Sequence, residues 1–105
     1  MASSTEYLDF ILEQLSLVDE ITHRPMMGEY IIYCQSKVIG GIYDDRFLIK
    51  TGEATSAFMR HPILEIPYEG AKPMILVDNL DDKEYLATLI SILVEELPEP
   101  KRRRH

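Results

Sequence analysis

Residues 30–50 read YIIYCQSKVIGGIYDDRFLIK, and this stretch decides the fold. It holds three short runs of β-branched and aromatic residues, which are typical of strands: 30–33, 38–43 and 46–50. A polar break, Gln35-Ser36-Lys37, separates the first two runs, and Asp44-Asp45 between the last two has the composition of a tight turn. Because connections this short join antiparallel neighbours, the pattern predicts a three-stranded antiparallel meander.

The second run contains the pair Gly40-Gly41. Glycine weakens a strand, since it has no side chain to pack, and a strand keeps it where the backbone bulges or another backbone comes close. The pair therefore predicts one of these two features in the middle of the meander.

Helices are expected on both sides of the meander. Residues 5–16 repeat apolar side chains at helical spacing, and Ser3 with Glu6 has the spacing of a capping box. After Asp81-Asp82, where an Asp is the expected cap, a second amphipathic helix runs to Leu97 and ends before Pro98. The segments left between are interpreted as a short helix (53–60) and two further strands (65–68 and 74–78).

The predicted fold class is α+β, in the order α-β-β-β-α-β-β-α. Strands that follow one another without a helix between them favour an antiparallel sheet, here five-stranded, with helices flanking it. Residues 1–97 are expected to form one domain, and residues 98–105 a disordered basic tail.

The charge is unevenly distributed along the chain. Of 105 residues, 11 are Lys or Arg and 18 are Asp or Glu, for a net charge of −7. Four of the cations lie in the last five residues, so the rest carries 7 against 18, or −11. Such a body repels phosphate backbones and is not expected to bind nucleic acid directly. With no stretch of about 20 apolar residues, a cytoplasmic protein without membrane contact is expected.

Candidate catalytic residues are few. Cys34, the single cysteine, lies in an apolar run and is interpreted as a buried structural thiol. His23 and His61 stand beside arginines and are interpreted as solvated loop residues, while His105 belongs to the tail. Asp44-Asp45 and Asp81-Asp82 suit a turn and a helix cap better than a metal site. No enzyme activity, metal or cofactor is therefore expected.

Several segments together resemble the N-terminal domain of the TfoX/Sxy family of competence regulators. They are Arg24-Pro25-Met26-Met27-Gly28, the stretch from Gly40 to Lys50, Ile66-Pro67-Tyr68 and Lys72-Pro73-Met74. The resemblance implies a regulatory domain on a five-stranded antiparallel sheet, similar to secretion-chaperone-like domains. Two residues depart from the family pattern: Met27 stands in place of the more usual Phe, and Glu29 in place of the second Gly. Longer members of the family also have a second, helical domain that resembles a DNA-binding module.

The segment from Arg24 to Gly28 has two interpretations. In the first, Met26 and Met27 offer an adaptable apolar surface to a protein partner, and Arg24 pairs with an acidic group. In the second, which the sequence favours, the methionines fill core gaps between helix and sheet, Arg24 pairs with a local carboxylate and Gly28 permits the strand entry.

Three hypotheses for function remain at this point. The first is a protein-interaction domain in transcriptional or competence regulation, acting through Arg24, Met26, Met27 and Gly28. The second is weak, salt-sensitive nucleic-acid binding through Lys101, Arg102, Arg103 and Arg104. The third is a small enzyme. A homodimer is also possible, because an open sheet leaves edge strands to cover.

Overall fold

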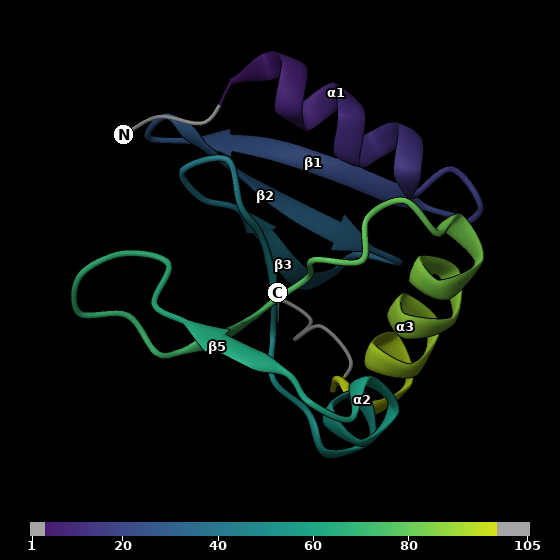
Figure 1. Ribbon diagram of the computed structural model, residues 1–105. Helices are drawn as coiled ribbons and strands as arrows, with labels where there is room; N and C mark the ends of the chain where they lie inside the picture. Colours follow the sequence, from purple (N-terminus) through teal and green to yellow (C-terminus); the bar gives the residue numbers. More distant parts are fainter. Residues whose placement is uncertain (1–3, 99–105) are drawn as a thin grey trace, which may run out of the picture.

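The computed structural model describes residues 4–98 (Figure 1). Within them, three helices span Thr5–Gln14 (α1), Glu53–Met59 (α2) and Lys83–Glu96 (α3). The strands span Ile21–Met26 (β1), Glu29–Cys34 (β2), Lys37–Ile42 (β3), Phe47–Ile49 (β4), Ile63–Glu65 (β5) and Met74–Leu76 (β6). None of the helices in this part of the chain is long and apolar enough to cross a membrane.

The strands form one antiparallel sheet in the order β1-β2-β3-β4-β6-β5. The α+β class and the antiparallel sheet are confirmed, but the expected number of five strands is wrong, because the described residues form six. The strand that the sequence pattern missed is β1, which pairs with β2 along its whole length. Its residues from Thr22 onward are exposed and include Pro25, a composition that only an edge strand tolerates.

The strand β5 lies two residues earlier than expected. The sequence predicts a strand over residues 65–68, but only Glu65 among them pairs with β6. Pro67 has no N–H for a ladder, and its carbonyl oxygen instead accepts a hydrogen bond from Arg46 Nη2 at 3.5 Å. Residues 66–73 therefore form a loop and not a strand.

Tight two-residue turns connect the first four strands. The central residues of these turns are Met27-Gly28, Gln35-Ser36 and Asp44-Asp45, and φ is positive at all of them. Positive φ at both central positions is the signature of the type I′ turn, whose twist matches that of paired strands. The turn predicted at Asp44-Asp45 is confirmed, and the backbones of Tyr43 and Arg46 hydrogen-bond to each other across it, at 2.9 and 3.1 Å.

The helices begin at side-chain caps. Ser4 Oγ accepts a hydrogen bond from the backbone N–H of Tyr7 at 3.1 Å, so the cap of α1 is Ser4 and not Ser3. The helix also ends at Gln14, two residues before the expected end. At α3, Asp82 Oδ1 accepts from the N–H of Tyr85 at 3.0 Å, which confirms an Asp cap.

The main core lies between one face of the sheet and the helices α1 and α3 (Figure 1). Leu8 and Ile11 of α1 face it, and α3 contributes Leu86, Leu89, Ile90, Leu93 and Val94. Phe47 and Ile49 supply the sheet side from β4. Both helical apolar stripes expected from the sequence are buried in this core. The short helix α2 packs against α3, where the rings of Phe58 and Tyr85 stack at 5.3 Å.

Both features predicted for Gly40-Gly41 are present. Ile32 pairs with Gly40 and Tyr33 with Val38, so Ile39 is an extra residue that makes a bulge in β3. A Cβ atom at Gly40 would collide with the backbone of Leu48 on β4. A Cβ atom at Gly41 would lie 2.6 Å from the backbone oxygen of Tyr30 on β2 and 2.8 Å from the ring of Tyr43. The glycines thus let neighbouring strands approach β3 closely and leave room for the Tyr43 ring beside Gly41.

Candidate functional site

The tip of the β1–β2 hairpin carries the segment that the sequence marked for partner binding. Met27 occupies the first position of the turn, with φ of 51°, and Gly28 the second, with φ of 85°. The side chain of Met27 is 96% exposed. Since a thioether side chain gains nothing from full exposure to water, its position is unfavourable for the isolated domain.

The interpretation of both methionines as core filling is wrong. Met26 is 39% exposed, since it lies on the sheet face opposite to α1 and α3, and Met27 lies outside the core because it is on the turn. Arg24 is exposed as well, and within residues 4–98 it has no ion-pair partner. Arg24 and Met26 are two residues apart on one strand, so both side chains project from the same face of the sheet.

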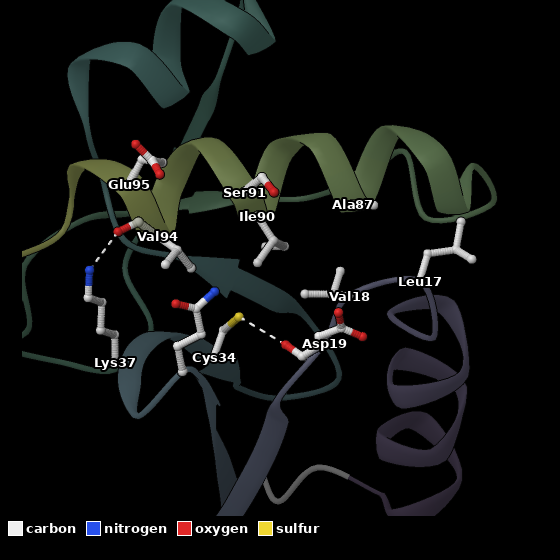
Figure 2. Close-up of a pocket in the computed structure, with 11 residues that line it drawn as sticks. Leu17, Val18, Asp19, Cys34, Lys37, Ala87, Ile90, Ser91, Val94 and Glu95 are labelled. Atoms are coloured by element: carbon white, nitrogen blue, oxygen red, sulfur yellow. Dashed lines mark hydrogen bonds between the residues drawn. The ribbon is translucent and has the colours of Figure 1, made fainter.

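A cavity of about 630 Å³ lies between the α1–β1 connection, the β2–β3 turn and α3 (Figure 2). Its lining combines apolar groups such as Val18, Ile90 and Val94 with polar groups such as Asp19 and Glu95. Figure 2 shows that these side chains come from opposite walls of the cavity. The volume is within the range of small-molecule sites.

The two most reactive groups in this cavity already have structural partners. Cys34 Sγ donates to the backbone oxygen of Asp19 at 3.5 Å, and Lys37 Nζ donates to the oxygen of Val94 at 2.9 Å (Figure 2). Burial raises the pKa of the Cys34 thiol, and the nearby Glu20 and Asp19 carboxylates raise this pKa further. The thiol therefore stays protonated near neutral pH, and Cys34 is confirmed as buried.

The remaining titratable candidates are dispersed. His23 is exposed on β1, where it lies on a strand rather than in the expected loop, and His61 is exposed after α2. The acid pair Asp44-Asp45 forms its turn, and Asp82 caps α3. Among residues 4–98, no three His, Cys, Asp or Glu side chains lie close enough to hold a metal ion. The basic residues Lys101, Arg102, Arg103 and Arg104 lie outside the described residues.

A second cavity lies on the sheet face opposite to α1 and α3, and no sequence pattern indicated it. Its walls come from β3, from the end of β4 and from the loop 66–73, which are far apart along the chain. Only the folding of this loop over the sheet brings them together. The only local sign in the sequence was Gly40-Gly41, which predicted a close approach but not a cavity.

Comparison with known proteins places the chain in a family. The model of the TfoX N-terminal domain matches residues 13–91. An uncharacterized 12.7 kDa protein in the trpE 5′ region of Spirochaeta aurantia is similar, with 30% identity over 105 residues that cover 99% of this chain and 91% of that protein. No solved structure gives a significant match. The family model spans both sides of the meander, from α1 to α3, and the chain therefore belongs to the TfoX N-terminal domain family.

Proposed function

We propose that this chain is a non-enzymatic regulatory domain that binds a partner protein through the tip of its β1–β2 hairpin. The tip is defined here as Arg24, Met26, Met27 and Gly28. The single observation that carries the proposal is the 96% exposure of Met27 on a tight turn. A large apolar side chain held in solvent by a turn has no role in the core, and methionine adapts well to varied partner surfaces.

The neighbours of Met27 support the same use. Met26 adds partly exposed apolar surface, and Arg24, on the same sheet face, adds a cation suited to pairing with a carboxylate. A type I′ hairpin is well ordered, so the tip loses little conformational entropy when a partner binds. Membership of the TfoX N-terminal domain family supports a role in gene regulation as part of this proposal, with competence as the process to examine first.

The test uses a photo-crosslinking amino acid at position 27 of the full chain, expressed in cells. A discrete crosslinked protein is expected, and the same crosslinker at Glu84, exposed on α3, should not capture it. With the captured protein purified, Met27→Glu should weaken binding at least tenfold, while Met27→Leu retains most of the affinity. Leu17→Glu is the matched control, because Leu17 is 56% exposed but lies away from the hairpin. Equal binding by Met27→Glu and by the unchanged protein would refute the proposal.

A further inference from the structure

The cavity on the sheet face opposite to α1 and α3, called here the sheet pocket, has an apolar lining. Its volume is about 430 Å³. Val38 and Gly40 of β3 line the sheet side of it, and Pro67, Pro73 and Met74 come from the loop 66–73 and the start of β6. The rings of Tyr43 and Tyr68 lie at one side with their centroids 6.0 Å apart and their planes at 51°. Such walls suit a flat apolar body of ring size.

The base of the loop that forms this wall is tied to the sheet. Arg46, next to β4, forms an ion pair with Glu65 at 2.5 Å and donates to the carbonyl oxygen of Pro67. Pro67 is buried, and the N–H of Ala71 closes a turn on the oxygen of Tyr68 at 3.0 Å. The base of the loop is therefore in place before any ligand binds, which lowers the free energy spent on ordering it.

The charges around the sheet pocket are opposite to those of the chain as a whole. Lys50 and Lys72 line it, and no carboxylate does, although the chain has 18 Asp and Glu against 11 Lys and Arg. Within residues 4–98 neither lysine has an ion-pair partner. Of the acids near it, Glu65 is paired with Arg46, and Glu69 belongs to the loop 66–73 but does not line the pocket. Two uncompensated cations beside an apolar wall attract an anion.

We propose that the sheet pocket binds a small organic anion that has a flat apolar body and one acidic group. The body packs between Tyr43, Tyr68 and Met74, and the acidic group lies between Lys50 and Lys72. A small molecule fits better than a peptide segment, because the loop 66–73 limits the cavity to about 430 Å³. The sheet pocket shares no residue with the hairpin tip, so this proposal does not depend on whether the tip binds a protein.

The experiment compares two fluorescent probes of nearly the same shape on the full chain. One is 8-anilinonaphthalene-1-sulfonate, which is an anion, and the other is the neutral N-phenyl-1-naphthylamine. The double variant Lys50→Gln/Lys72→Gln should weaken binding of the anionic probe about tenfold and leave the neutral probe unchanged, since only the sulfonate loses a charge-assisted contact. Tyr68→Ala should weaken the binding of both probes. The matched control is Arg60→Gln/Lys83→Gln, which removes two cations that line neither the sheet pocket nor the hairpin tip.

The place of binding is checked by the backbone amide spectrum of the ¹⁵N-labelled protein. The anionic probe should shift the resonances of Gly40, Gly41 and Ala71. The proposal is overturned if the probe shifts Leu17 and Ile90, which belong to the other cavity, or Met27 at the hairpin tip. It is also overturned if both double variants weaken the anionic probe equally, because that result would mean that net charge and not the two lysines controls binding.

Discussion

The carboxylate of Glu96, the last residue of α3, accepts hydrogen bonds from both the backbone N–H and the hydroxyl of Thr55, in the first turn of α2. It also accepts from the N–H of Ala54 at 3.1 Å. The residue that precedes α2 is Gly52, which has no side chain to cap the helix, and a Cβ atom there would collide with the Glu96 carboxylate. One helix thus supplies the cap of another.

We expect Glu96→Ala to lower the free energy of unfolding by about 1 kcal/mol, the usual cost of losing an N-terminal cap. The loss arises because the N–H groups of the first turn of α2 lose their acceptor. Urea denaturation followed by circular dichroism measures it. Glu95→Ala is the control, since the Glu95 side chain is exposed one residue earlier on the same helix. Equal effects of the two substitutions would mean that the cap adds no stability.

The same contact predicts a dependence of stability on pH. The hydrogen bond from the Thr55 side chain, together with backbone N–H groups, holds the pKa of Glu96 below its ordinary value of 4.5. A carboxyl whose pKa is lowered by folding stabilises the protein above its unfolded pKa, and this contribution disappears as the pH falls through the folded pKa. The difference in stability between the unchanged protein and Glu96→Gln should therefore be full at pH 7 and shrink toward pH 3. A difference that grows on acidification would contradict the assignment.

Gly40→Ala should destabilise the fold by about 1–3 kcal/mol, the usual cost of forcing an extra methyl group into a packed site. The added methyl group meets the backbone of Leu48, which cannot move without breaking the β3–β4 ladder. Gly70→Ala is the comparison, since its Cβ atom would meet nothing within 4 Å although φ is +87°. It should cost about 1 kcal/mol through backbone strain alone. Thermal denaturation of both variants measures which substitution costs more stability. A larger loss of stability for Gly70→Ala than for Gly40→Ala would refute the prediction.

Replacing Gln35-Ser36 by Asn-Gly should stabilise the protein by about 0.5–1 kcal/mol. The φ angles of Gln35 and Ser36 are 53° and 67°, which ordinary residues adopt at a cost and which Asn and Gly favour in type I′ turns. The urea midpoint is the measurement. The control introduces the same Asn-Gly pair at Thr51-Gly52, which lies outside any hairpin turn. This control variant should not raise the urea midpoint. No rise for the variant at 35 and 36 would mean that its turn is not type I′ in solution.

Cys34 should react with a thiol reagent only when the protein unfolds. Its side chain is 1% exposed and burial raises the pKa of the thiol, so both access and thiolate fraction are low. At pH 8, the rate with Ellman's reagent should be far below that of the denatured chain and should rise in step with unfolding across a urea series. Fast reaction of the native protein would contradict the buried position.

Element identity was largely predictable from the sequence, because local patterns determine it. The apolar repeats of α1 and α3, the runs of β2, β3 and β4, and the polar turn at Asp44-Asp45 each follow from spacing within one segment. The missed strand lies in an exposed segment, where apolar and polar residues do not alternate and the sequence therefore gives no strand signal. The strand β1 is exposed from Thr22 onward and is a strand only because it pairs with β2.

The segment Arg24–Gly28 shows how far the candidate binding site could be predicted from the sequence. The sequence marked these residues, yet it favoured a core role for Met26 and Met27, since apolar side chains beside a strand usually pack inside. Met26 is exposed because it lies on the sheet face that the helices leave uncovered, and Met27 because it lies on the turn. Which face the helices cover is a property of the packed domain.

By itself, the sequence determined the family, the α+β class, both core-facing helices and the turns of the meander, because these depend on neighbours in the chain. Only the tertiary structure decided the sixth strand, the exposure of Met27 and the sheet pocket. These features depend on contacts between segments far apart, such as Arg46 with Glu65 and Pro67, and no local spacing encodes such contacts.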